Sequence, residues 1–204
     1  HNGDFNGAGI RHAPNAGNLT IVGSHVENNQ NGVMGGGGPG TFVRVHDSTF
    51  IGNGHGDGRA HGIYINAADE FIVTNSTFKD QFVGHHIKSL ATKRTVVRNS
   101  VIDDAGGNAS MNVDVTAGGN VLVEGNQIVQ SAKSDNRHIV WYHTKRGPQG
   151  ADTPAGEIVL RGNEITNKHD PATLVGAPID LDGLTLTVIP TTLLRTWIRA
   201  GGPS

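Results

Sequence analysis

The feature of this sequence that most constrains its fold is a short motif that recurs six times. Each copy alternates apolar with polar side chains, passes through Gly, Asp or Asn followed by Ser or Asn, and closes on Val, Phe or Ile. Alternation with period two is typical of β-strands, and the central residue pair is typical of tight turns. The six copies are LTIVGSHV (19–26), VRVHDSTF (43–50), FIVTNSTF (71–78), TVVRNSVI (95–102), VLVEGNQI (121–128) and IVLRGNEI (158–165).

The spacing of the copies indicates how they assemble. Their closing residues stand at 26, 50, 78, 102, 128 and 165, which gives steps of 24, 28, 24, 26 and 37 residues. A unit of this size cannot bury its own apolar face, so successive units must stack into a continuous core. A β-sandwich with evenly spaced strands is the alternative, but it does not require the same turn pair in every copy. We therefore predict an all-β parallel solenoid (β-helix) of about six to seven rungs.

The 204 residues fit one domain, which we divide into two parts. We expect residues 1–166 to form the rungs. Residues 167–204 have strand character without the turn pair, so we expect an irregular last rung followed by a tail or cap. No capping segment is recognisable at the other end either, and six clear rungs are few for a β-helix. We therefore expect a homo-oligomer, or a piece of a longer protein with further flanking rungs.

Composition excludes several classes of function. Sixteen Lys and Arg against eighteen Asp and Glu leave a net charge of -2, so the chain lacks the broad basic field that nucleic-acid binding needs. The absence of Cys excludes disulfides and thiol chemistry. No stretch approaches the roughly 20 apolar residues of a membrane span. We expect an extracellular or periplasmic protein, although the sequence carries no signal peptide.

Stacked rungs place equivalent residues in columns about 4.8 Å apart, so chemistry is sought in columns. Fourteen residues before the closing positions 78, 102 and 128 stand Tyr64, Lys88 and Asp114, each after an apolar residue predicted to point inward. Two positions upstream are His86 and Asn112. The next rung supplies Tyr142 or His143 from VWYHT, with Trp141 predicted to point inward. The side chains expected to line one outward groove are Tyr64, His86, Lys88, Asn112, Asp114 and Tyr142.

This residue set suits work on an acidic sugar. Eliminative cleavage of a uronate polymer needs a positive group or metal to neutralise the carboxylate, a base for the α-proton and an acid for the leaving oxygen. We predict Lys88, His86, Tyr64 and Asp114 as catalytic residues. Asn112, Tyr142 and His143 are predicted to bind substrate. The plainer alternative is that Lys88 and Asp114 form a surface salt bridge.

Two polar loops precede strands of this groove. The segment 52–61 carries His55, Asp57, Arg59 and His61, and the segment 134–138 carries Arg137 and His138. Loops often supply the specific contacts of a site, so we predict that Arg59, His61, Arg137 and His138 bind substrate. His55 and Asp57 are candidate metal ligands, with calcium as the candidate ion, although exposed turn residues are the commoner outcome.

Over 9–166, the repeated motif resembles the right-handed parallel β-helix superfamily of pectate-lyase-like proteins, whose rungs close on an apolar-x-Asn-Ser/Asn-x-apolar pattern. The resemblance implies a single-stranded right-handed β-helix that acts on a polysaccharide. The run GHHIKSLATKRTVVRNSVID also resembles the alginate lyase and chondroitinase B family, which implies that Lys88 is the proton-abstracting base. That family's partner arginine has no counterpart here, because Asp114 stands at the corresponding outward position.

We expect a carbohydrate-active protein, and a lyase or C5-epimerase on a uronate-containing polymer is favoured because both reactions begin with abstraction of the same α-proton. Two alternatives remain open at this point. One is a non-catalytic polysaccharide-binding or structural solenoid, such as a surface protein or a phage-spike segment. The other is a glycoside hydrolase, for which Asp114 and Asp57 are the evident carboxylate pair.

Overall fold

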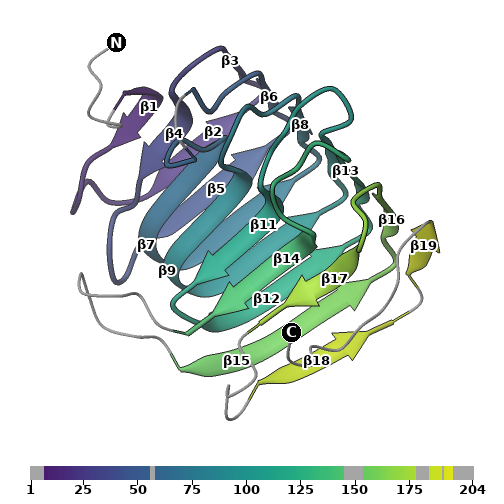
Figure 1. Ribbon diagram of the computed structural model, residues 1–204. Helices are drawn as coiled ribbons and strands as arrows, with labels where there is room; N and C mark the ends of the chain where they lie inside the picture. Colours follow the sequence, from purple (N-terminus) through teal and green to yellow (C-terminus); the bar gives the residue numbers. More distant parts are fainter. Residues whose placement is uncertain (1–6, 56–57, 145–153, 178–183, 190, 195–204) are drawn as a thin grey trace.

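A computed structural model describes residues 7–55, 58–144, 154–177, 184–189 and 191–194. Every regular element in these ranges is a β-strand, and every strand pairing is parallel. The strands stack along one axis over about six turns of the chain (Figure 1). The all-β parallel solenoid predicted from the repeat is therefore confirmed, and no helix occurs among the described residues.

The strands form three faces that run the length of the solenoid. Face 1 contains β1 (Ala8–His12), β4 (Asn31–Gly35), the first halves of β7 (Ile63–Thr74) and β9 (His85–Arg98), β11 (Met111–Thr116), β14 (His138–His143) and β17 (Thr173–Gly176). Face 2 contains β2 (Leu19–Val22), β5 (Phe42–His46), the second halves of β7 and β9, β12 (Gly119–Glu124), β15 (Ala155–Arg161) and β18 (Thr185–Val188). Face 3 contains β3 (His25–Glu27), β6 (Thr49–Ile51), β8 (Thr77–Lys79), β10 (Val101–Asp103), β13 (Gln127–Gln130), β16 (Glu164–Asn167) and β19 (Thr192–Leu194).

The recurring turn pair joins face 2 to face 3. Its first residue has a left-handed backbone, for example φ 50 at Asp47, 51 at Asn75 and 61 at Gly162, which Gly, Asn and Asp adopt most readily. Its second residue builds a buried ladder between rungs. Ser76 donates its backbone N–H to Ser100 Oγ at 3.1 Å, and the Ser100 N–H is donated to Asn126 Oδ1 at 2.9 Å. The ladder satisfies buried backbone groups and explains why the pair recurs.

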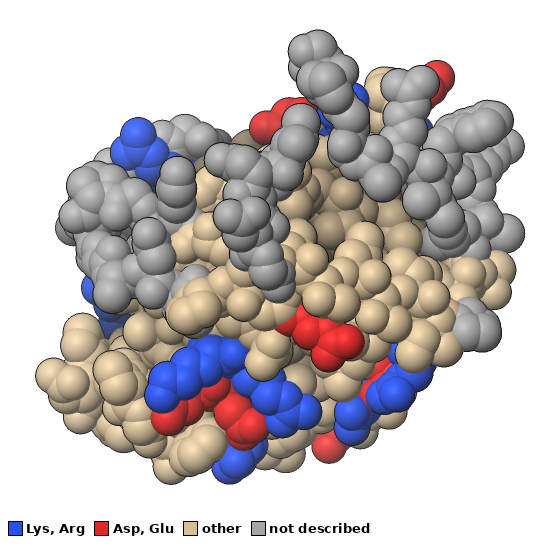
Figure 2. Space-filling model, turned by 90° about the horizontal axis from the view of Figure 1, so that it is seen from below, with Lys and Arg blue, Asp and Glu red and all other residues tan. Residues whose placement is uncertain are grey.

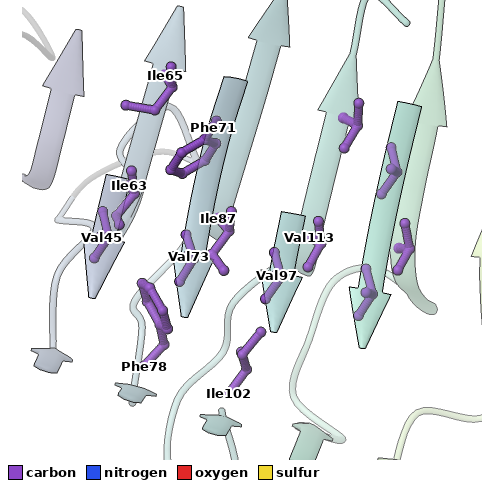
Figure 3. Packing of buried hydrophobic residues seen from close by; sticks show 14 of the residues in the cluster. Val45, Ile63, Ile65, Phe71, Val73, Phe78, Ile87, Val97, Ile102 and Val113 are labelled. Carbon is purple, nitrogen blue, oxygen red and sulfur yellow. The ribbon is translucent and has the colours of Figure 1, made fainter. Parts of the chain in front are cut away.

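The core is a column of apolar side chains that all three faces share. Figure 3 shows Val73 and Val97 of face 2 directed into the same interior as Ile63 and Ile87 of face 1. Interior residues of the central rungs are buried, and like residues of neighbouring rungs pack on one another. Phe78 stacks on Phe50 with ring centroids 4.9 Å apart. The apolar residues of the alternating motif thus face the interior of the solenoid, and its polar residues face outward.

Strands β17, β18 and β19 continue the three faces beyond Asn167. Leu186 and Val188 align with the fully buried Ile158 and Leu160, yet they are 47% and 44% exposed. Core positions of the last described rung are therefore left open to solvent. No helix among the described residues is long and apolar enough to cross a membrane.

Candidate functional site

Face 1 carries a column of four aligned polar and aromatic side chains on consecutive rungs. The strand register pairs Tyr64 with Lys88, Lys88 with Asp114, and Asp114 with Trp141. Tyr64, Lys88 and Asp114 are therefore aligned as predicted, but Asp114 is only 2% exposed, so the prediction that it lines an open groove is wrong. Three strand spacings separate Tyr64 from Trp141, roughly 14 Å, so an aromatic side chain stands at each end of the column and a charged pair in its middle.

The Lys88 ammonium group lies in direct contact with a carboxylate oxygen of Asp114. The Lys88 side chain is 18% exposed, whereas that of Asp114 is 3% exposed. The other carboxylate oxygen accepts a hydrogen bond from Thr116 Oγ1 at 3.0 Å, and His85 Nε2 lies 3.3 Å from the first. Burial by itself raises the pKa of Asp114, but His85, Lys88 and Thr116 together outweigh it and leave that pKa below its ordinary value.

Two histidines of neighbouring rungs lie beside this pair. The rings of His61 and His85 stack with centroids 4.9 Å apart, and His61 Nδ1 accepts the backbone N–H of His85 at 3.0 Å. Burial lowers the pKa of His85 to about 4, with Asp114 opposing the shift and Lys88 adding to it. Burial, His85 and Lys88 likewise hold the pKa of His61 well below its usual range. Both imidazoles are therefore neutral near pH 7.

A glycine on the following rung makes room for the aromatic end of the column. Gly176 aligns with Trp141, and a Cβ there would lie 2.6 Å from Trp141 Cε3 and 2.5 Å from His138 Nδ1. Both rings lie across this position, with centroids 5.0 Å apart. Burial, then Arg137 and His169, lowers the pKa of His138 to about 4. A neutral imidazole and an indole thus form one partly exposed aromatic surface.

The prediction that Tyr142 faces outward and Trp141 inward is wrong. Tyr142 is completely buried, and its hydroxyl donates to Gly119 O at 2.8 Å and accepts the N–H of Gly156 at 2.9 Å. The register explains the error, because Tyr142 aligns with the inward Val115. Alternation from Ile139 predicts an inward Trp141, but that alternation fails because Ile139 and Val140 are both buried.

The prediction that His86 and Asn112 line the groove is also wrong, since each is only 1% exposed. Strict alternation fails at the start of β9, where His86 and Ile87 are both buried. His86 Nε2 lies 3.2 Å from Asp104 Oδ1, and Asp104 Oδ2 accepts the Ala109 N–H at 2.7 Å. His86 therefore helps to hold the segment that leads into β11.

The loop residues are distributed around the column. His61 lies beside the column, with its ring centroid 5.4 Å from that of Tyr64, but it is only 4% exposed. His143 aligns with Thr116 on the column's flank, while Arg59 and Arg137 are exposed. His55 stacks on Phe82 with centroids 4.7 Å apart, and Asp57 lies outside the described residues. Within the described ranges, no group of three or more His, Asp or Glu side chains is arranged to hold a metal ion.

Three residues of the site were not predicted from the sequence to belong to it. Trp141 was assigned to the core, whereas His85 and Thr116 were given no role. A signal existed for His85, because adjacent side chains of a strand point to opposite sides, so either His85 or His86 faces outward whatever the register. The signal for Thr116 is its position two residues after Asp114, on the same side of the strand.

The surface seen in Figure 2 has a different character. Lys and Arg side chains lie directly beside Asp and Glu side chains there, so charges of both signs are interleaved. Such pairs occur on face 2 between Asp69 and Lys93 and between Glu70 and Arg94. The described chemistry of face 1 is instead a charged pair beside neutral histidines and aromatic rings, which suits acid–base work and contact with a sugar polymer. Comparisons of the chain with protein-family models, with curated protein sequences and with solved structures found no match.

Proposed function

We propose that the protein acts on a uronate-containing polysaccharide, as a lyase or C5-epimerase, and that the polymer lies along the outward column of face 1. The observation that carries the proposal is the register of Tyr64, Lys88, Asp114 and Trp141 on four neighbouring strands. A column that crosses the rungs suits an extended polymer, because successive sugar units meet successive strands. The extracellular or periplasmic location expected from the sequence is where such polymers occur.

Each member of the column has a role in this proposal. Tyr64 and Trp141 hold sugar rings at the two ends. Lys88 is the most exposed member of the charged cluster, and its ammonium group neutralises the uronate carboxylate, which acidifies the adjacent C5–H. Asp114 is a positioning residue that fixes Lys88. In elimination, a base takes the C5 proton, the C4=C5 double bond forms as the C4–O bond breaks, and Tyr64 protonates the leaving oxygen.

Two groups are candidates for the base, and pH separates them. His85 is neutral above a pKa of about 4, so a His85 base gives a rate that falls only as the pH drops through about 4. The family resemblance assigns the base to Lys88, and a lysine base gives a rate that climbs toward alkaline pH. The pH profile of kcat/KM therefore assigns the proton transfer.

The test is a panel of uronate polymers, namely alginate, polygalacturonate and chondroitin sulfate, each with and without calcium. Elimination creates an unsaturated product that absorbs in the ultraviolet, and epimerisation changes the NMR spectrum of the polymer without cleaving it. We expect turnover on one polymer and its loss by at least 100-fold in Lys88→Ala. Arg94→Ala, on face 2, is the matched control and should keep wild-type turnover. No new absorbance and no epimerised unit across the panel would sink the enzymatic proposal.

A specific contact favours a second candidate, a non-catalytic polysaccharide-binding solenoid. The Lys88 ammonium group is already neutralised by Asp114, as in a structural ion pair. Binding without turnover would then be expected, and affinity electrophoresis on the same polymers measures it. Binding that persists with no turnover, and that weakens in Trp141→Ala, identifies the protein as a binding module.

A further inference from the structure

A cavity of about 560 Å³ lies where the chain passes from face 3 to face 1. Its lining residues lie in the segments that precede β4, β7, β9, β11 and β14, together with Ile51 at the end of β6. These turns lie side by side along one edge of the solenoid (Figure 1). The volume is within the range of small-ligand sites, roughly 300–1,000 Å³. None of the column residues of face 1 lines it.

One wall of the cavity is the ring of Phe82. It is among the few large apolar side chains exposed in the described residues, at 43%. The exposed ring of His55 stacks on the Phe82 ring with centroids 4.7 Å apart, and the Phe82 backbone N–H is donated to Asn53 O at 2.9 Å. An exposed apolar ring whose backbone is hydrogen-bonded to the neighbouring rung offers a ligand a flat surface for stacking.

The other walls present polar side chains without partners of their own. Asn28, Asp80, Asn108 and Lys133 line the cavity, and within the described residues none of their side chains makes a hydrogen bond or an ion pair. The wall itself is fixed, since the Asn108 N–H is donated to Gln81 O at 3.0 Å. Asp80 accepts hydrogen bonds, Lys133 donates them, and the two amides do both.

We propose that this cavity is a second carbohydrate site, which binds one neutral pyranose unit independently of face 1. A pyranose has an apolar face of C–H groups for Phe82 and hydroxyl groups around its rim for Asp80, Asn28 and Asn108. The charges of Asp80 and Lys133 balance, so the cavity has no preference for an anionic sugar. Face 1 differs in composition, because the partly exposed ammonium group of Lys88 lies there beside the buried carboxylate of Asp114. The proposal does not depend on turnover at face 1.

The experiment is an NMR titration of the ¹⁵N-labelled chain with four neutral hexasaccharides built from glucose, mannose, galactose and xylose. We expect at least one of them to shift the amide signals of Phe82 and Asn108 at millimolar concentration, without shifting those of Lys88 and Asp114. Phe82→Ala should weaken this binding at least tenfold, whereas Phe82→Trp should retain it. Because Phe82 is exposed, the alanine variant should fold normally, and its unperturbed spectrum verifies this.

The outcomes separate the two sites. Lys88→Ala should leave the titration at Phe82 unchanged, even where it abolishes turnover on a uronate polymer. If no hexasaccharide shifts the Phe82 and Asn108 signals, or if Phe82→Ala binds as tightly as the wild type, the second site does not exist. Loss of binding in both Phe82→Ala and Lys88→Ala would also overturn the proposal, because it would place the sugar on face 1.

Discussion

Faces 1 and 2 share the long strands β7 and β9, but their charged side chains differ in how far they are exposed to water. On face 1, Asp114 is 3% exposed and contacts Lys88, His85 and Thr116. On face 2, Glu124 is 22% exposed and lies between Arg98 and Arg161, which are 41% and 46% exposed. The residue types are alike, so their neighbours make the difference. Rings packed beside a charged pair remove water from it, and an open surface does not.

The largest expected contrast between the faces is in stability. Asp114→Asn leaves the Lys88 ammonium group half-buried without its counter-charge, and removing one partner of a buried pair typically costs about 3–5 kcal/mol. Glu124→Gln removes a carboxylate whose arginine partners are well exposed, so we expect a much smaller loss of stability. Urea unfolding measures both free energies of unfolding. Equal losses in the two variants would show that the face 1 pair is as well hydrated as the face 2 pairs.

The second contrast is in the response to acid. The pKa of His85 falls from 6.5 in the unfolded chain to about 4 in the fold, so the unfolded state binds the proton more tightly. The free energy of unfolding therefore decreases by roughly 3 kcal/mol in total as the pH falls from 6.5 toward 4. Above pH 6.5 His85 causes no such decrease. His85→Gln should therefore flatten the dependence of stability on pH by about 1.4 kcal/mol per pH unit within this window.

A face 2 variant provides the control for the acid response. The hydrogen bond from Lys93 is the main cause that places the pKa of Asp69 below its ordinary 3.8. The stability that it contributes is therefore present above pH 3.8 and is lost only at lower pH. Lys93→Ala should leave the slope between pH 6.5 and 4 unchanged. A slope that changes as much in this variant as in His85→Gln would contradict the assignment of the response to face 1.

The sequence predicts the rungs well because the interior imposes one rule on every copy. The turn pair at Asn75 and Ser76 recurs since each rung needs a left-handed residue and then a side chain that reaches the next rung. That rule fixed the register of Lys88 and Asp114. It fails where a residue outside the repeat decides, as at Tyr142, whose hydroxyl satisfies two backbone groups inside the fold. His86 is another exception, because Asp104 of a loop holds it inward.

The smallest expected contrast is in salt dependence, and it tests the cause of the difference between the faces directly. The coupling between Arg98 and Glu124, measured by a double-mutant cycle, should be small and should decline in 1 M NaCl, where the screening length is about 3 Å. The coupling between Lys88 and Asp114 should survive the same salt, because ions cannot enter between two side chains that neighbouring rings cover. If both couplings decline in parallel, water reaches both pairs equally. In that case burial does not distinguish face 1 from face 2, and it cannot be the reason that the histidines beside Lys88 are neutral.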